Sequence, residues 1–296
     1  MKKRLLLVLL VFTLFALPAH AETVDISTYV INLEEYNIVT GTYVLEFFLE
    51  LRCDYECSFE DFVLINGKAD DIIILEHLPN YKSYRVRAYL ENDIDLHAYP
   101  FDSQEVTVEL EHKRLPSNRL RFKPIPQLTG VDNRATIPGW RIAGWDAVEV
   151  IQPYAVYDEA YSRYEFTLYL EREKLDSFIK DFIPMFFLII ILMFTFILGI
   201  DKIELRIATV SSVLLTAMVY HLTIASRLPP LGYLTFADKF MMLTYFISVI
   251  AIIVDIIELR MLNLKERRQV LSIDKRAAYV SLIVVPVLYI LLFLLF

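Results

Sequence analysis

Two patterns of hydrophobic and polar residues divide the chain. Between Glu22 and Leu175, apolar residues recur at every second position in several short segments that turn residues separate. The clearest alternating sets are Tyr43, Leu45, Phe47, Leu49 and Leu51; Val106, Val108 and Leu110; and Tyr164, Phe166, Leu168 and Leu170. A period of two is typical of strands with one buried face. Many such segments in succession predict an antiparallel β-sandwich over residues 22–175.

The remaining residues, 176–296, contain four long apolar segments: Phe178–Leu198, Leu205–Leu228, Phe240–Ile257 and Ala277–Phe296. Each has about 20 residues, the length of a helix that crosses the hydrocarbon core of a bilayer. We therefore expect a transmembrane domain of four helices, with the C-terminus on the same side of the membrane as the β-domain. Basic residues in the loop after the third segment predict that this loop is cytoplasmic: Arg260, Lys265, Arg267, Arg268, Lys275 and Arg276.

The first residues have the pattern of a secretory signal peptide. A basic start, Lys2 to Arg4, precedes an apolar run, and the run ends in Ala19-His20-Ala21, which fits a cleavage site. We expect a signal peptide over residues 1–21; a retained N-terminal anchor is the alternative. Export by this route places the β-domain and the C-terminus in the periplasm or outside the cell, and the helices in the inner or plasma membrane.

Composition narrows the class of protein. Hydrophobic residues make up 56% of the 296 residues, which is high for a soluble protein and agrees with membrane spans. The net charge of −8 argues against nucleic acid as a partner. The sequence has no Gly-rich phosphate loop, HExxH motif or CxxC pair, and its five histidines are scattered. We therefore expect no enzyme activity, no cofactor and no metal site.

The second apolar segment carries polar side chains that a helix facing only lipid does not need. One straight helical face passes through positions three or four residues apart: Glu204, Ala208, Ser212, Leu215, Val219, Leu222 and Ser226. We call these residues the stripe. Several copies of this helix around an axis would enclose a water-filled pore. A helix packed in a bundle, with its hydroxyls bonded back to its own carbonyls, is the alternative.

Four short motifs occur along the chain in a definite order. Tyr99–Gln104 reads YPFDSQ, Arg172 precedes Pro184, Ser211–Leu215 reads SSVLL, and Leu228–Asp238 reads LPPLGYLTFAD. With the signal peptide, the β-domain and the four spans, this order resembles the pentameric ligand-gated ion channels, or Cys-loop receptor superfamily, and in particular its bacterial members. The cysteines that flank the first motif in animal members are replaced here by Asn92 and Val106, so that disulfide is absent.

The resemblance implies a homopentamer in which each subunit contributes its stripe to a central pore for permeant ions. Leu215, Val219 and Leu222 would form the gate, because water leaves a narrow apolar constriction and ions cannot pass without water. Glu204 would form a carboxylate ring that selects cations. Arg206 lies off the stripe and is expected to pair with Glu204 or with cytoplasmic groups.

The resemblance also implies a coupling surface through which the β-domain moves the pore helices. Its residues would be Tyr99, Pro100, Phe101, Asp102, Arg172, Pro229 and Tyr233. We expect these side chains at the junction between the β-domain and the membrane.

A ligand site, if the chain keeps the one that the resemblance implies, lies between subunits. One wall would be the hairpin with Tyr154, Tyr157, Tyr161 and Tyr164, and the other would include Phe48. Aromatic faces suit cationic amines; ordinary hairpin packing is the alternative. The family's Trp-x-Pro and Trp-x-Asp motifs are missing, so the ligand is unknown. Protons are a second candidate stimulus, because the β-domain is rich in carboxylates, which raise one another's pKa.

Cys53 and Cys57 bracket three residues after a strand. A hairpin tip brings residues four apart close enough for a disulfide, and an oxidising compartment favours the bond; two unpaired thiols are the alternative. In the family that the chain resembles, this tip faces the membrane near the pore helix. We therefore expect the disulfide to affect gating rather than folding.

The sequence thus predicts a β + α membrane protein that acts as a gated, cation-selective homopentameric channel in a lipid bilayer, opened by a ligand or by a pH change. A four-span periplasmic sensor or adaptor that does not conduct ions is the alternative.

Overall fold

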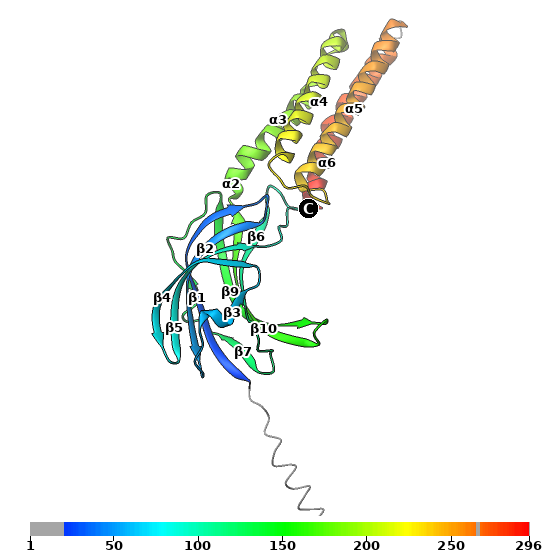
Figure 1. The fold of residues 1–296 in the computed structure, drawn as a ribbon. Coiled ribbons are helices and arrows are strands. Elements are labelled where there is room, and N and C mark those ends of the chain that lie inside the picture. Colours follow the sequence, from blue (N-terminus) through cyan, green and yellow to red (C-terminus); the bar gives the residue numbers. More distant parts are fainter. Residues whose placement is uncertain (1–20, 265–266, 296) are drawn as a thin grey trace, which may run out of the picture.

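The structure is a computed structural model that describes residues 21–264 and 267–295. Within these residues, two β-sheets form an N-terminal domain, and four long helices extend from one end of it (Figure 1). The β-sandwich followed by four apolar helices confirms the fold class that the hydrophobic pattern predicts. Apart from Ala21, the expected signal peptide of residues 1–21 lies outside the described residues.

The described strands form two sheets. They are β1 (Glu22–Asn37), β2 (Thr42–Cys53), β3 (Phe62–Leu64), β4 (Gly67–Leu78), β5 (Tyr81–Glu91), β6 (Ser103–His112), β7 (Leu120–Pro124), β8 (Gly130–Val131), β9 (Trp140–Tyr154) and β10 (Glu159–Arg172), with a 3₁₀ turn η1 (Phe59–Asp61) before β3. One sheet has the order β4-β5-β2-β1-β7, with β8 also paired to β1. The other sheet has the order β3-β6-β10-β9.

The expectation of a wholly antiparallel sandwich is wrong at one edge, because β7 and β8 run parallel to β1. The chain leaves β6 in one sheet, crosses at residues 113–119 and enters the other sheet at Leu120, which pairs with Glu22 at the start of β1. β7 therefore starts at the same end as β1 and runs in the same direction.

The core of the β-domain consists of alternate residues from both sheets. The positions that alternate in the sequence are buried: Tyr43, Leu45, Phe47, Leu49, Leu51, Val106, Val108, Leu110, Tyr164, Phe166, Leu168 and Leu170. Burying one such side chain contributes about 1.5–3 kcal/mol. This shared core holds the two sheets face to face.

The helical part begins directly after β10. It comprises α2 (Lys174–Ser177), the π-helical turn η2 (Phe178–Phe182), α3 (Ile183–Thr195), the 3₁₀ turn η3 (Ile200–Lys202), α4 (Ile203–Ala225), α5 (Phe236–Asn263) and α6 (Arg267–Leu294). Among the described residues, four helical stretches are long and apolar enough to cross a membrane, and they contain α3, α4, α5 and α6.

The basic stretch expected as a loop after the third span is mostly helical. Arg260 lies in α5, and Arg267, Arg268, Lys275 and Arg276 lie in α6, while Lys265 is outside the described residues. The expected loop is therefore wrong in extent. Hydropathy marks the length that sits in hydrocarbon, whereas Arg and Lys are good helix formers, so the helices continue beyond the apolar stretch.

The end of α6 lies beside the start of α5. The rings of Phe293 and Phe236 are 4.9 Å apart between centroids. Figure 1 shows this end of α6 next to the β-domain, so both lie at the same end of the helical bundle. We call this end of the helices the outer end and the opposite end the inner end.

Cys53 and Cys57 are joined by a disulfide, with 6.3 Å between their Cα atoms. Cys53 pairs with Val24 near the start of β1, whereas Ile38, just after β1, packs against the core of the helical part. The disulfide therefore lies at the end of the β-domain away from the helices. The expectation that it faces the membrane is wrong, because β1 runs toward the helices and β2 runs back.

Candidate pore surface and coupling interface

α4 has one packed face and one open face in the subunit. The packed face consists of Ile203, Arg206, Val210, Val213, Ala217 and Ile224, which are buried. The stripe residues are all exposed. The apolar side chains in the middle of the stripe remain open to a large degree, with Leu215 at 64%, Val219 at 56% and Leu222 at 70% exposure. The structure thus leaves the whole stripe free to face water, lipid or a second subunit.

The hydroxyls of α4 bond to the helix itself. Ser212 Oγ donates to the Ala208 carbonyl at 2.9 Å, and Thr216 Oγ1 donates to the Ser212 carbonyl at 2.8 Å. Thr223 and Ser226 make similar bonds. Such bonds allow a hydroxyl in an apolar helix. They fit the alternative interpretation of the sequence, but these side chains are exposed in the subunit rather than packed within it.

At the inner end of α4, Glu204 and Arg206 lie on different sides of the helix. Glu204 is exposed, whereas Arg206 is fully buried. Arg206 contacts Asp255, Glu258 and Asp274 from α5 and α6. Two positions along an α-helix turn by about 200°, so the pairing of Arg206 with Glu204 that the sequence left open does not occur.

At the outer end of α4, His221 links the helix to α5. Its Nε2 lies 2.7 Å from Asp238 Oδ1, and its Nδ1 lies 2.8 Å from the Tyr245 hydroxyl. Asp238 also accepts hydrogen bonds from the backbone and the hydroxyl of Thr235, which caps α5. The sequence places His221 off the stripe, and the structure packs it against the neighbouring span.

An ion pair closes the junction between the β-domain and the helices. Arg172, the last residue of β10, donates from Nε to Asp102 Oδ1 at 2.6 Å and from Nη2 to Asp102 Oδ2 at 3.0 Å. Gln104 Nε2 donates to the same carboxylate at 2.9 Å. The Asp102 side chain is almost completely buried. A bidentate, buried pair of this kind fixes the loop before β6 to the chain segment that enters the first membrane helix.

The loop before β6 also contacts the α4–α5 connection and the start of α5. The ring of Tyr233 stacks on His97 with centroids 3.7 Å apart, and its hydroxyl accepts a hydrogen bond from the Leu96 backbone at 2.9 Å. The backbone N–H of Ala237 donates to the carbonyl of Tyr99. Phe101 packs against Phe236, with centroids 6.1 Å apart.

Two other predicted coupling residues lie near these contacts. Pro100 follows Tyr99 in the loop before β6, and Pro229 lines a hollow with His221 and Tyr233. The predicted coupling residues are thus brought to one junction.

In the loop before β6, the backbone and ring of His97 hydrogen bond to Asp95 and lower the pKa of its carboxyl.

Trp140 is a residue of this junction that the sequence did not indicate. The Arg172 guanidinium carbon lies 4.4 Å from the centre of the indole, and Tyr36 packs edge-on against the same ring. Trp140 starts β9 and Tyr36 lies near the end of β1, so the indole connects both sheets to the arginine. Trp140 pairs with Arg172 in the register of β9 and β10, and no local pattern in the sequence indicates this pairing.

The tyrosine-rich hairpin of β9 and β10 extends away from the sandwich (Figure 1). Tyr157 at its tip is exposed. Tyr154 and Tyr161 pack edge-to-face with centroids 5.8 Å apart. Phe48 lies on the outer face of β2, in the other sheet, where it lines a hollow with Tyr29 and Leu75. Within one subunit, the two predicted walls of the ligand site lie on different sheets.

The inclusion of Tyr164 in the ligand wall is wrong. This tyrosine is fully buried in the core of the sandwich, where burial raises its pKa to about 12. It follows the alternation of Phe166 and Leu168, and this pattern places it on the inner face of β10.

Carboxylates crowd around Arg163 on the outer face of β6 and β10. Arg163 contacts Glu109 and Glu111 at 2.7 Å each and lies 3.9 Å from Glu165. Burial and the charge of Glu109 raise the pKa of Glu165, against the lowering effect of Arg163. One arginine therefore lies within 3.9 Å of three carboxylates on this face. The acidic composition of the β-domain predicts such crowding of carboxylates.

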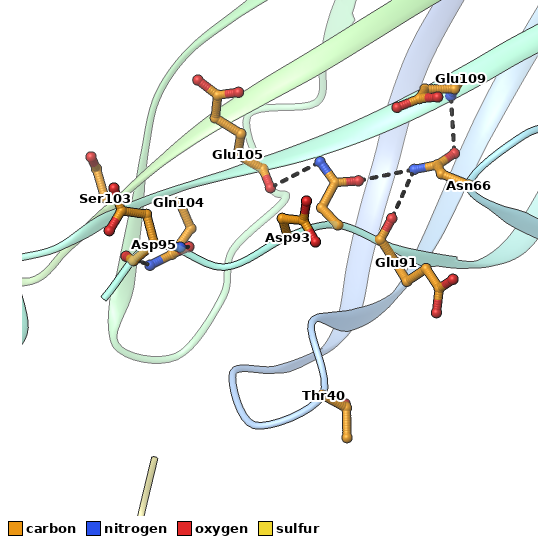
Figure 2. Close-up of a pocket in the computed structure, with 10 residues that line it drawn as sticks. Thr40, Asn66, Glu91, Asp93, Asp95, Ser103, Gln104, Glu105 and Glu109 are labelled. Atoms are coloured by element: carbon orange, nitrogen blue, oxygen red, sulfur yellow. Dashed lines mark hydrogen bonds between the residues drawn. The ribbon is translucent and has the colours of Figure 1, made fainter. Parts of the chain in front are cut away.

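Figure 2 shows a polar pocket beside the loop before β6. Glu91, Asp93, Asp95, Glu105 and Glu109 contribute to its lining. Asn66 donates hydrogen bonds to the side chain of Asn92 and to the backbone carbonyl of Glu91. The Asn66 side chain thus connects the segment before β4 to the segment after β5 along one wall of the pocket. Within residues 21–264 and 267–295, no group of three or more His, Cys, Asp or Glu side chains is arranged to hold a metal ion.

Comparison with known proteins gives relatives but no matching family model. A proton-gated ion channel from Gloeobacter violaceus is 23% identical over 169 residues, which cover 57% of this chain and 46% of the relative. The acetylcholine receptor subunit beta-type unc-29 from Caenorhabditis elegans is 28% identical over 206 residues, which cover 69% of this chain and 38% of the relative. The matched segments thus span less than half of each relative.

Proposed function

We infer that this chain, which resembles the pentameric ligand-gated ion channels in sequence and in fold, is a subunit of a gated ion channel. Two of its relatives are a proton-gated ion channel and an acetylcholine receptor subunit. Its fold combines a β-sandwich with four apolar helices and an ion-paired junction between them. These features support a channel rather than an enzyme.

The open face of α4 is the observation that carries the proposal. α4 lies in the least hydrophobic of the membrane-length stretches, and its exposed stripe mixes a carboxylate and hydroxyls with leucine and valine. Such a surface suits a water-filled path better than hydrocarbon. A single helix cannot enclose water, so several subunits must surround the path. The resemblance gives the number five and a homopentamer.

The proposed gate is the apolar middle of the stripe. Copies of Leu215, Val219 and Leu222 around the axis form a collar that water leaves when the collar is narrow. Glu204 at the inner mouth forms a carboxylate ring that favours cations. The burial of Arg206 supports this selectivity. Arg206 follows Glu204 by two residues, and it does not face the open side of α4, where its positive charge would oppose that of Glu204.

The gating signal is a ligand or a proton sensed by the β-domain. The aromatic hairpin and Phe48 support an amine bound between subunits. The carboxylates around Arg163 support protons, because protonation removes repulsion among Glu109, Glu111 and Glu165. We propose that the signal reaches α4 through the Asp102–Arg172 pair and the Tyr233 contacts, in a protein whose β-domain is periplasmic.

Recording current through purified protein in a planar bilayer with a KCl gradient tests the proposal, with activation scanned over pH and over small amines. We expect gated current that reverses near the potassium equilibrium potential. Glu204→Gln removes the ring charge with little change in shape and should move the reversal potential toward that of chloride.

Asp201→Asn is the matched control. It neutralises an exposed carboxylate, three residues before Glu204, that pairs with Arg267 at 2.9 Å, and it should leave selectivity near that of the wild type. An anion-selective wild type contradicts the selectivity proposal. Absence of current from a protein whose β-domain still binds a ligand would favour the non-conducting sensor.

A further inference from the structure

A buried group of charges joins the helices at their inner end. It consists of Arg206 from α4, Asp255 and Glu258 from α5, and Asp274 from α6. We call these four residues the inner charge cluster. Phe196, directly after α3, lies with its ring centre 5.8 Å from the guanidinium carbon of Arg206. Arg206 thus contacts α5, α6 and the residue that follows the end of α3.

The cluster surrounds the guanidinium with carboxylates. Nη2 of Arg206 lies 2.7 Å from Asp255 Oδ1, and Nη1 lies 2.6 Å from Asp274 Oδ1 and 3.4 Å from Glu258 Oε2. The side chains of Arg206 and Glu258 are fully buried, and that of Asp255 is 1% exposed. Asp255 and Glu258 are three residues apart and therefore share one face of α5.

The cluster holds more acid than one arginine needs. One cation faces three carboxylates, so the formal charge of the ionised group is 1 − 3 = −2. Glu258 Oε1 and Arg206 Nε are buried without a hydrogen-bond partner among the described residues, and Arg206 Nη2 and Asp255 Oδ1 are in ion-pair contact without hydrogen-bond geometry. Surplus buried carboxylates are costly, so packing or stability alone does not explain the third acid.

We propose that the inner charge cluster determines ion selectivity, by holding Arg206 away from the pore and by outweighing its positive charge at the pore mouth. This inference rests on the proposed function, in which Glu204 lines that mouth. Arg206 follows Glu204 by about 3 Å along the helix axis. A freed or unneutralised guanidinium at that level cancels the potential of the Glu204 ring.

The chemistry of arginine fits this role. Its planar fork reaches carboxylates on two other helices at once, whereas a lysine ammonium is a single point charge on a flexible stem. The fork therefore fixes the rotation of α4 about its own axis, and that rotation directs Glu204 to the open side.

Two variants test the inference by reversal potentials in a KCl gradient. Arg206→Lys keeps the charge but loses the fork. The double variant Asp255→Asn/Glu258→Gln keeps Arg206 paired with Asp274 but removes the surplus negative charge. Both should lower the potassium-to-chloride permeability ratio several-fold, and Asp201→Asn should not. A purely structural cluster would change thermal stability and leave the reversal potential unchanged, and this result would overturn the inference.

Size-exclusion chromatography shows whether each variant assembles. If the double variant does not assemble, reversal potentials of Arg206→Lys and of Asp274→Asn are measured instead. Asp274→Asn removes the charge of the most accessible of the three carboxylates. Wild-type reversal potentials in both contradict the inference.

Glu204→Gln is measured in parallel to separate the two claims. If Glu204→Gln lowers the permeability ratio and the cluster variants do not, the cluster inference alone fails. If Glu204→Gln has no effect, the proposed selectivity site itself fails.

Discussion

α4 and α6 lie in the two membrane-length stretches with the smallest buried share in the subunit, yet their exposed surfaces differ. From residue 277 onward, α6 exposes mainly aliphatic and aromatic side chains, among them Tyr279, Val280, Leu282, Ile283, Val284, Val287, Ile290 and Leu291. α4 exposes Ser211, Ser212, Thr216, Thr223 and Glu204 among its leucines. A helix surface that is exposed in one subunit can therefore face either of two environments in the assembled protein. An apolar surface suits lipid, and a mixed surface suits water.

The packed faces of the two helices differ as well. Apart from Asp274, which contacts Arg206 of α4 at the inner end, α6 packs on α5 through apolar residues and a bond of 2.8 Å between the hydroxyls of Tyr289 and Thr244. α4 carries Arg206 at its inner end and His221 at its outer end, and both make charged or hydrogen-bonded contacts with α5. α4 is thus held by polar contacts at both ends and has an open stripe between them, which is consistent with the proposal that it lines a path.

The largest expected effect is a change in resting current or activation from a substitution in the apolar middle of the stripe, compared with the same substitution on the exposed face of α6. Leu215→Ser should wet the proposed gate and produce leak current or greater sensitivity. Leu215 is exposed in the subunit, and in the proposed collar its copies would bury one another. Loss of that burial forfeits about 1.5–3 kcal/mol per subunit, which is enough to shift a poised equilibrium. Planar-bilayer recording checks this.

The matched control is Leu282→Ser, at an exposed position of α6. It should leave resting current and activation close to those of the wild type. The comparison fails if Leu215→Ser behaves like Leu282→Ser.

A second effect should appear in activation but not in open-channel conductance. Asp102→Asn leaves Arg172 without its buried partner, a change that costs about 3–5 kcal/mol at such sites. The junction should loosen, so that a stronger stimulus is needed to open the channel. Dose–response curves and single-channel amplitudes separate these effects.

Asp132→Asn provides the control for this ion pair. Its partner, Arg134, is 88% exposed, and exposed pairs contribute about 0–1 kcal/mol. Activation should therefore stay near the wild-type value. A reduced single-channel conductance in Asp102→Asn would show that the pair acts on the pore itself rather than on coupling.

The smallest effect on current should come from the disulfide. Cys53→Ser/Cys57→Ser should lower the stability of the β-domain by about 2 kcal/mol, because the loop that the bond closes is short. Activation should be unchanged, because the bond lies away from the helices. Thermal unfolding and current recordings check this, and mass spectrometry of non-reduced peptides checks the bond. A reductant that alters activation would contradict this account.

Local pattern was enough to predict β2, β6 and β10 and the open face of α4. Tyr43 to Leu51 alternate and are buried as expected, and the steps of the stripe mark residues that are exposed together. The same alternation also shows that Tyr164 belongs to the core, although the hairpin's tyrosine content suggested a surface role.

Contacts between distant segments could not be predicted in this way. The partners of Arg206 lie on α5 and α6, at least 49 residues away (255 − 206). A carboxylate pair three apart in an apolar span, Asp255 and Glu258, was the available signal, because such residues require a partner. The position of the disulfide depends on strand direction, which a local pattern does not contain.

We propose that the stripe of α4 faces a water-filled conduction path and that the exposed face of α6 does not. Single cysteines at Ser212 and Val219 on α4, and at Val284 and Val287 on α6, can be exposed to a small cationic methanethiosulfonate reagent during recording. We expect modification at the two stripe positions to block current in the open channel and modification at the two α6 positions to leave it unchanged. Block at the α6 positions, or open-channel current that the reagent leaves intact at both stripe positions, would contradict it.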